Sequence, residues 1–135
     1  MTKFTLMVIL IGTIATIFPV VSHADRNEKT FTPSDILAAD PEFDGLSVNV
    51  KGWLFLDNRG ALAIWNDENA KNNQDIGSCL TVYSRFARGK FSKFSSHQVT
   101  LRGIYRSDLA NGRIDLHMCN KNGIDATELP QYSRR

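Results

Sequence analysis

The sequence is poor in the residue types that build most catalytic and metal sites. It has three histidines and two cysteines among 135 residues. It contains no G-x-S-x-G nucleophile motif, no phosphate-binding P-loop and no H-E-x-x-H zinc motif. A single histidine on a strand, such as His117, is more often a structural or surface residue than a catalytic base. We therefore expect no catalytic residue, no metal site, no cofactor and no enzymatic activity.

The sequence also lacks a strong charge of either sign. Its 16 basic and 14 acidic side chains leave a formal net charge of +2, which argues against bulk attraction to nucleic acid or anionic lipid. The charges are unevenly spread, however, because residues 76–107 contain lysines and arginines but no acid.

One long apolar run stands at the start of the chain. Lys3 precedes the run Phe4 to Val21, and Ser22 and Ala24 occupy the two small-residue positions of a signal peptidase site. We predict a signal peptide over 1–24, cleavage before Asp25, and a periplasmic or secreted protein with no stable membrane insertion after cleavage. An uncleaved anchor helix is the alternative, because a run of this length could just span a bilayer.

The two cysteines, Cys79 and Cys119, both lie beyond this segment. An even number of cysteines in an exported chain predicts a disulfide, because that compartment is oxidising. The alternative is a copper site in which His117 and Met118 join Cys119 as soft ligands.

The rest of the sequence indicates one short helix followed by strands. Thr32 is a candidate N-cap and Pro33 suits the first helical position, so a helix is expected from Pro33 to Ala39. Period-two patterns, turn residues and glycines then predict five strands. These are expected at residues 46–56, 61–65, 79–84, 98–106 and 113–119, with a hairpin at 57–60, a polar loop at 66–78 that has at most one helical turn, and a tight turn at 111–112.

The first and fourth of these strands resemble one another. "FDGLSVNVKGWL" begins at Phe43 and "FSSHQVTLRGIY" at Phe94, and without a gap Gly52 aligns with Gly103. Glycine inside a strand allows a bulge or a sharp coil. Two long strands that bend and meet are what closes a five-stranded Greek-key barrel of the OB type. We predict this all-β fold, with an SH3-like barrel or a small sandwich as alternatives.

The resulting domain plan has four parts. Residues 1–24 form the signal peptide, 25–45 an N-terminal segment with the short helix, 46–124 the barrel and 125–135 a C-terminal tail.

The stretch "LAADPEFDGLSVNVKGWLFL", with the later "VTLRGIY" and "CNKNGI", resembles small exported bacterial OB-fold proteins, most of them uncharacterised. The resemblance implies a fold and an exported location rather than an activity.

Binding is therefore the expected class of function, and it has two forms. In the first, the barrel face and the loops at 57–60 and 66–78 bind a protein or glycan of the cell envelope, with Arg59 and Trp65 as contacts.

In the alternative form, cations and aromatic rings of the basic stretch bind single-stranded nucleic acid, with rings stacking on bases. Its candidate residues are Tyr83, Arg85, Phe86, Arg88, Lys90, Phe91, Lys93, Phe94, Arg102, Tyr105 and Arg106. The competing interpretation is that the phenylalanines plug the end of the barrel while the cations are merely solvated.

Overall fold

The structure is a computed structural model, which describes residues 29–109 and 118–134. The predicted signal peptide, the 111–112 turn and residues 113–117 of the expected fifth strand lie outside the described residues. The strands are β1 (Thr30–Phe31), β2 (Ser47–Leu56), β3 (Leu62–Trp65), β4 (Cys79–Ser84), β5 (His97–Arg106), β6 (Gly123–Ala126) and β7 (Gln131–Tyr132). The helices are α1 (Pro33–Ala38) and α2 (Glu68–Asn72), with 3-10 turns η1 (Ile76–Ser78), η2 (Arg88–Lys90) and η3 (Ser92–Phe94). Neither α-helix within the described ranges is long enough to cross a membrane.

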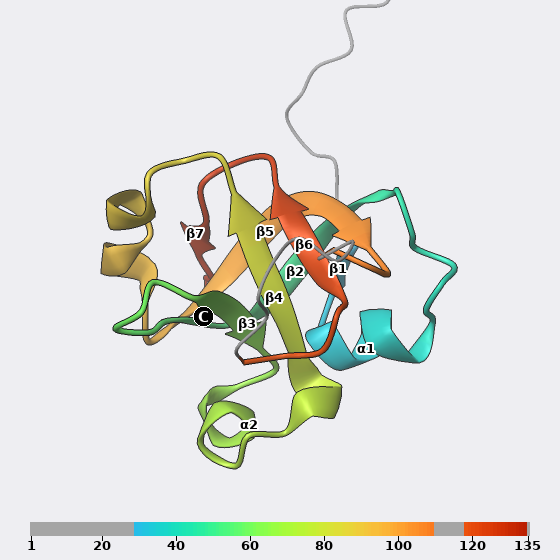
Figure 1. The fold of residues 1–135 in the computed structure, drawn as a ribbon, viewed down its shortest axis with the longest axis horizontal. Coiled ribbons are helices and arrows are strands. Elements are labelled where there is room, and N and C mark those ends of the chain that lie inside the picture. Colours follow the sequence, from blue (N-terminus) through green and yellow to red (C-terminus); the bar gives the residue numbers. More distant parts are fainter. Residues whose placement is uncertain (1–28, 110–117, 135) are drawn as a thin grey trace, which may run out of the picture.

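The strands form a closed barrel with the strand order of the OB type (Figure 1). The order runs β2-β3-β4-β6-β5, and β5 returns to pair with β2. All barrel neighbours are antiparallel except β4 and β6, which run parallel. The predicted fold class is confirmed, with β1 and β7 added as short edge strands.

The two long strands each serve two neighbours along one edge. The first half of β2 pairs with β1 and its second half with β3, while β5 pairs first with β7 and then with β6. Gly52 lies just before the part of β2 that pairs with β3, and Gly103 lies where β5 begins to pair with β6. The β2–β5 register runs through both positions without interruption, so the glycines are not bulges in this ladder. A Cβ at Gly52 would lie 2.3 Å from the Trp65 carbonyl oxygen, and one at Gly103 would lie 2.5 Å from that of Asp125. Glycine is therefore needed for the close approach of a neighbouring backbone.

The barrel interior is filled by side chains that alternate along each strand. Fully buried examples are Val50, Leu54, Ile64, Leu80 and Leu101. Phe91 and Phe94, from the turns between β4 and β5, belong to the same core, at 0% and 6% exposure. This confirms that these two phenylalanines close the barrel rather than face solvent.

The segment before β2 seals another part of the barrel. Thr32 caps α1 in a capping box with Asp35, as its sequence predicts. After the helix, Asp40 Oδ1 accepts hydrogen bonds from the hydroxyls of Tyr105, at 2.8 Å, and Ser107. The buried Asn122 in turn donates to the Tyr105 hydroxyl at 2.9 Å. Three segments distant in sequence are thus joined by one polar cluster.

The position of the fifth barrel strand was predicted wrongly. The expectation was residues 113–119, but Met118 and Cys119 lie in a bend and the strand is β6 at Gly123–Ala126. Ile124 and Ala126 face the core, whereas Gly123 lies close to the backbone of Thr81. The barrel consequently extends past residue 124, and β7 lies within what was expected to be a tail.

Candidate binding site

A second apolar cluster lies on the outer face of β2, β3 and β4. Side chains alternate between the two faces of a strand. The sequence neighbours of the core residues Leu54 and Ile64 therefore point outward, and here these neighbours are apolar as well. The buried members are Ala63, Trp65, Cys79 and Cys119, and Trp53, Phe55, Ala70 and Met118 pack against them. The outer face of an antiparallel strand is commonly solvated, so this cluster marks a covered surface.

The cover comes from two segments that are far apart in sequence. One is α2, which follows β3 and is capped by Asp67, whose Oδ1 accepts from the Ala70 amide at 2.7 Å. Figure 1 shows this helix at the end of the barrel where β3 ends and β4 begins. The other is the residue pair Met118 and Cys119, which is tied to β4 by a disulfide.

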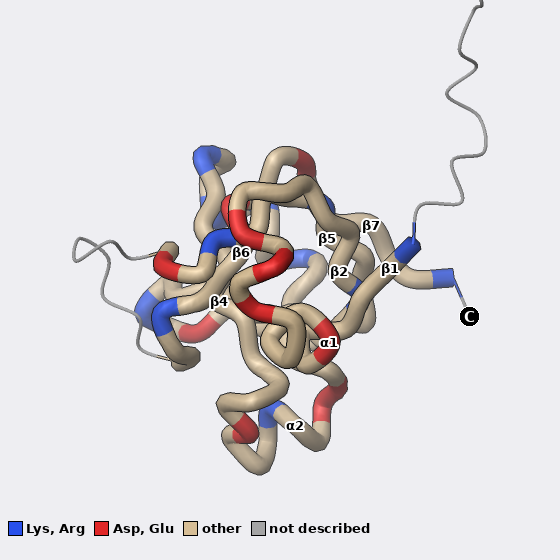
Figure 2. Tube along the Cα trace, turned by 90° about the vertical axis from the view of Figure 1, so that its right-hand side faces the viewer, with Lys and Arg blue, Asp and Glu red and all other residues tan. Residues whose placement is uncertain are grey.

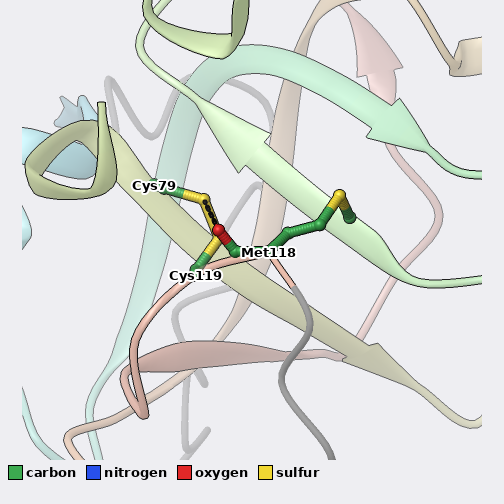
Figure 3. The surroundings of a disulfide bond; sticks show 3 residues. All are labelled: Cys79, Met118 and Cys119. Atoms are coloured by element: carbon green, nitrogen blue, oxygen red, sulfur yellow. Dashed lines mark hydrogen bonds between the residues drawn. A yellow bond between two sulfur atoms is a disulfide. The ribbon is translucent and has the colours of Figure 1, made fainter. Parts of the chain in front are cut away.

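The disulfide joins Cys79 to Cys119, as predicted, with their Cα atoms 5.6 Å apart (Figure 3). The cysteines meet because each precedes one of two parallel strands: Cys79 begins β4, and Cys119 lies just before β6. The bond also places Met118, whose carbonyl oxygen is 3.9 Å from Cys79 Sγ. Figure 3 shows the Met118 side chain extending from the bond over the neighbouring strand.

A pocket of about 460 Å³ opens beside this cluster. Its lining comes from the end of β2, from β3, from α2 and the residues after it, and from the disulfide-linked segment. The lining residues are Phe55, Asp57, Trp65, Lys71, Gln74, Ile76 and Met118. The pocket therefore lies between the hairpin at 57–60 and the polar segment at 66–78, the two loops that the sequence proposed as binding elements.

Polar groups of the pocket differ in how far they are already engaged. Asp57 Oδ1 accepts from the amides of Arg59, at 2.9 Å, and Ala61, at 2.7 Å, so this carboxylate holds its own hairpin. The ammonium of Lys71 sits 4.1 Å from the centre of the Phe55 ring, a cation–π contact that fixes a positive charge in the pocket wall. The indole nitrogen of Trp65 is buried and has no hydrogen-bond partner among the described residues.

Trp65, one of the two contacts that the sequence predicts, is 3% exposed and lines the pocket, so a ligand would meet it inside the pocket rather than on the open surface. Arg59 is exposed on the hairpin beside the pocket but does not line it. Arg88 of η2 donates a hydrogen bond to the carbonyl of Gly60. This bond brings the hairpin that carries Arg59 next to the basic segment between β4 and β5.

The basic aromatic stretch does not form the groove expected of a single-strand binder. Tyr105 is fully buried, so it is not a binding residue, and Phe91 and Phe94 are core residues. Arg85, Arg88 and Lys90 are exposed, but Arg102 lies on β5 and lines a separate pocket of about 300 Å³ near β1 and β7. Figure 2 likewise shows lysines and arginines at several separate places on the surface.

The sequence predicts the two loops beside the pocket but not most of its individual lining residues. Lys71, Gln74 and Ile76 lie in the predicted binding loop at 66–78, where the sequence does not single them out, and the sequence indicates Met118 only as an alternative copper ligand. The available signal was the apolar "WLFL" run, whose outward residues Trp53 and Phe55 require a cover. Among the residues that the structure describes, no cluster of three or more His, Cys, Asp or Glu side chains is suited to a metal ion.

Comparisons with known proteins add no further constraint: no protein-family model matches the chain, and searches of curated proteins and of solved structures found no significant match.

Proposed function

We propose that this chain is an exported, non-enzymatic binding module for a protein or glycan of the cell envelope. Its binding surface is the outer face of β2, β3 and β4, and the pocket beside Trp65 is the seat of the ligand. The observation that carries the proposal is a mixed apolar and polar pocket in which a buried indole N–H has no partner in the part of the chain that the structure describes. Pockets of about 300–1,000 Å³ with apolar walls and a few placed polar groups are typical ligand sites.

Two features support the exported location. The first residues have the charge, apolar run and small-residue spacing of a signal peptide. The Cys79–Cys119 bond belongs to an oxidising compartment, because cytosolic thiols are kept reduced.

The pocket chemistry favours recognition over catalysis. Lys71 is held on the Phe55 ring and one oxygen of Asp57 is held by hairpin amides, so both charged groups are fixed in place. Nucleic-acid binding is the less favoured function, because stacking needs exposed rings and three of the five candidate rings, those of Phe91, Phe94 and Tyr105, are buried.

Retention on envelope material tests the proposal. The purified protein is mixed with envelope fragments that are untreated, protease-digested or periodate-oxidised, and the co-sedimenting fraction is measured. We expect retention that Ile76→Glu abolishes, because Ile76 is 45% exposed and lines the pocket. The matched control is Leu46→Glu, since Leu46 is 54% exposed just before β2 and does not line the pocket.

The treatments separate the two partner classes. Loss of retention after protease indicates a protein, whereas loss after periodate alone indicates a glycan. No retention on untreated fragments, or equal loss for Ile76→Glu and Leu46→Glu, would contradict a binding function at this pocket.

A further inference from the structure

We infer that the ligand of this pocket is an acidic saccharide, bound through a sugar carboxylate that meets Lys71. The inference rests on the proposed function and names the chemistry of the ligand at the same site.

Three of the described lining residues carry N–H donors. Lys71 supplies an ammonium, Gln74 an amide that both donates and accepts, and Trp65 a buried indole N–H without a partner among the described residues. Asp57 is the only acidic side chain among the described lining residues, and its Oδ1 already accepts hydrogen bonds from two backbone amides. A ligand rich in acceptors therefore fits better than one rich in donors.

A carboxylate satisfies this set more fully than neutral hydroxyls do. Hydrogen bonds between an ammonium and a carboxylate are about twice as strong as those between neutral groups. Lys71 is half-buried, and the contact with Phe55 keeps its charge at one place, so part of the ordering of this long side chain is complete before a ligand arrives. The cation is thus held in the wall of the pocket, where it can meet an anionic ligand, instead of being carried by a freely moving surface side chain.

The unpartnered indole provides a second reason. Leaving a buried donor without a partner is unfavourable, and this penalty is relieved if a ligand oxygen reaches Trp65 Nε1. Trp65 belongs to the outer cluster, against which Met118 packs, and it also lines the pocket. Binding should therefore change the environment of this tryptophan.

The rest of the lining suits the body of a sugar. Four of the lining side chains, Phe55, Trp65, Ile76 and Met118, are apolar, and they share the wall with the polar ones. A pyranose ring has an apolar C–H face and a hydroxyl-bearing rim, so it can contact both kinds of wall. A peptide that ends in a carboxylate shares only the acidic group with such a ligand.

The test compares oligogalacturonic acids with their methyl esters, which have the same sugar rings without the charge. Binding is followed by tryptophan fluorescence and titration calorimetry. We expect the acids to bind at least about tenfold more tightly than the esters, the effect of roughly 1.4 kcal/mol. Lys71→Gln should remove this preference and Lys71→Arg should retain it, because arginine keeps the cation.

Arg59→Gln is the matched control, since it removes a cation beside the pocket that is not part of the lining. It should leave the preference unchanged. Thermal melting of each variant shows whether loss of the Lys71–Phe55 contact has unfolded the protein; if Lys71→Gln fails to fold, the acid–ester comparison on the unaltered protein still decides the inference.

The inference is wrong if neither form binds, if the esters bind as tightly as the acids, or if Lys71→Gln leaves the preference intact. Its failure is distinguishable from that of the proposed function. Retention on envelope fragments that protease destroys, with no saccharide binding, overturns the acidic saccharide and leaves the binding module. Absence of retention on all three kinds of fragment, the untreated one included, overturns both the proposed function and the acidic saccharide.

Discussion

Val50 and Leu101 face one another across the β2–β5 ladder, and both are fully buried. They also hold the same place in the two similar sequence stretches, "SVNVKGW" and "QVTLRGI". The register that pairs them joins Val48 to Gly103 and Gly52 to Val99, so exchange of the two strands reproduces the ladder. The repeated sequence thus corresponds to a local two-fold relationship between the strands that close the barrel.

The first prediction concerns the two glycines of this arrangement. Gly52→Ala and Gly103→Ala should each lower the free energy of unfolding by about 1–3 kcal/mol, because the new methyl group would meet a neighbouring backbone carbonyl. The measurement is the urea midpoint of each variant.

Gly89→Ala is the control for these variants, since a Cβ at Gly89 meets nothing within 4 Å. It should be tolerated with little change. Equal tolerance at Gly52, Gly103 and Gly89 would show that close approach of the strands is not what requires glycine.

Much of the barrel could be predicted because its determinants are local. Alternation of Val48 and Val50 with polar residues indicates a strand, Asp57 and Gly60 specify the hairpin, and Gly60 indeed has a φ of 84°. The third predicted strand coincides with β4, Cys79–Ser84. Such signals need no knowledge of the partner strand.

The errors arose where long-range packing decides. "RIDLHMC" has better period-two alternation than "GIDA", but the barrel uses the shorter strand because glycine at position 123 permits close packing against Thr81. Most of the lining residues were not predicted individually for a related reason: the lining joins β2, α2 and the residue before Cys119, which are separate in sequence. Only the disulfide and the outward apolar residues point to that junction.

A second prediction concerns acid stability. The hydroxyl of Ser107, followed by that of Tyr105, donates to Asp40 and holds the pKa of this carboxyl below its ordinary value of 3.8. The stabilisation from charged Asp40 is therefore present above that pH and is lost as pH falls through the lowered pKa. Asp40→Asn should be less stable than the wild type near neutral pH, and the difference should shrink in acid.

Urea unfolding at several pH values measures this difference. Ser107→Ala serves as a companion variant, because it removes the largest cause of the lowered pKa and should weaken the pH dependence. A gap between wild type and Asp40→Asn that is constant with pH would contradict the assignment.

A third prediction concerns the hydroxyl of Tyr105. Tyr105→Phe leaves the buried Asn122 amide without this acceptor, so we expect a loss of about 1–3 kcal/mol. Burial raises the pKa of Tyr105 to about 12, so its stabilisation is complete below the ordinary value of 10.0 and is lost as pH rises toward 12.

The control is Tyr83→Phe, because Tyr83 is 43% exposed and its change should fall within about 0.5 kcal/mol. Urea midpoints compare the two variants, and alkaline unfolding tests the pH dependence. An equal effect at both positions, or the same alkaline loss in Tyr105→Phe as in the wild type, would show that this hydroxyl does not stabilise the fold.

The fourth prediction is that the mature protein begins at Asp25. The small residues Ser22 and Ala24 define the cleavage site expected before it. Intact mass of the protein from a periplasmic extract or the medium measures the start directly. A protein that retains residues 1–24 would remove the argument for export as a cleaved chain.

The last prediction is that reduction of the Cys79–Cys119 bond opens the pocket before it unfolds the barrel. The bond spans a sequence separation of 40 residues, so the chain-entropy relation gives it about 4 kcal/mol of stability. It holds Met118 and Cys119 on the outer cluster, whereas the barrel interior is a separate core that includes neither. Release of this segment should therefore first expose Trp65, whose exposure is otherwise 3%.

The measurement is fluorescence quenching by acrylamide in reductant, with Trp53→Phe used so that the fluorescence comes from Trp65 alone. Circular dichroism in the same samples follows the strands, and thiol labelling of the unfolded, non-reduced protein should find no free thiol. Two reactive thiols per chain would disprove the bond, and simultaneous loss of strands and Trp65 burial would show that the cover and the barrel are one cooperative unit.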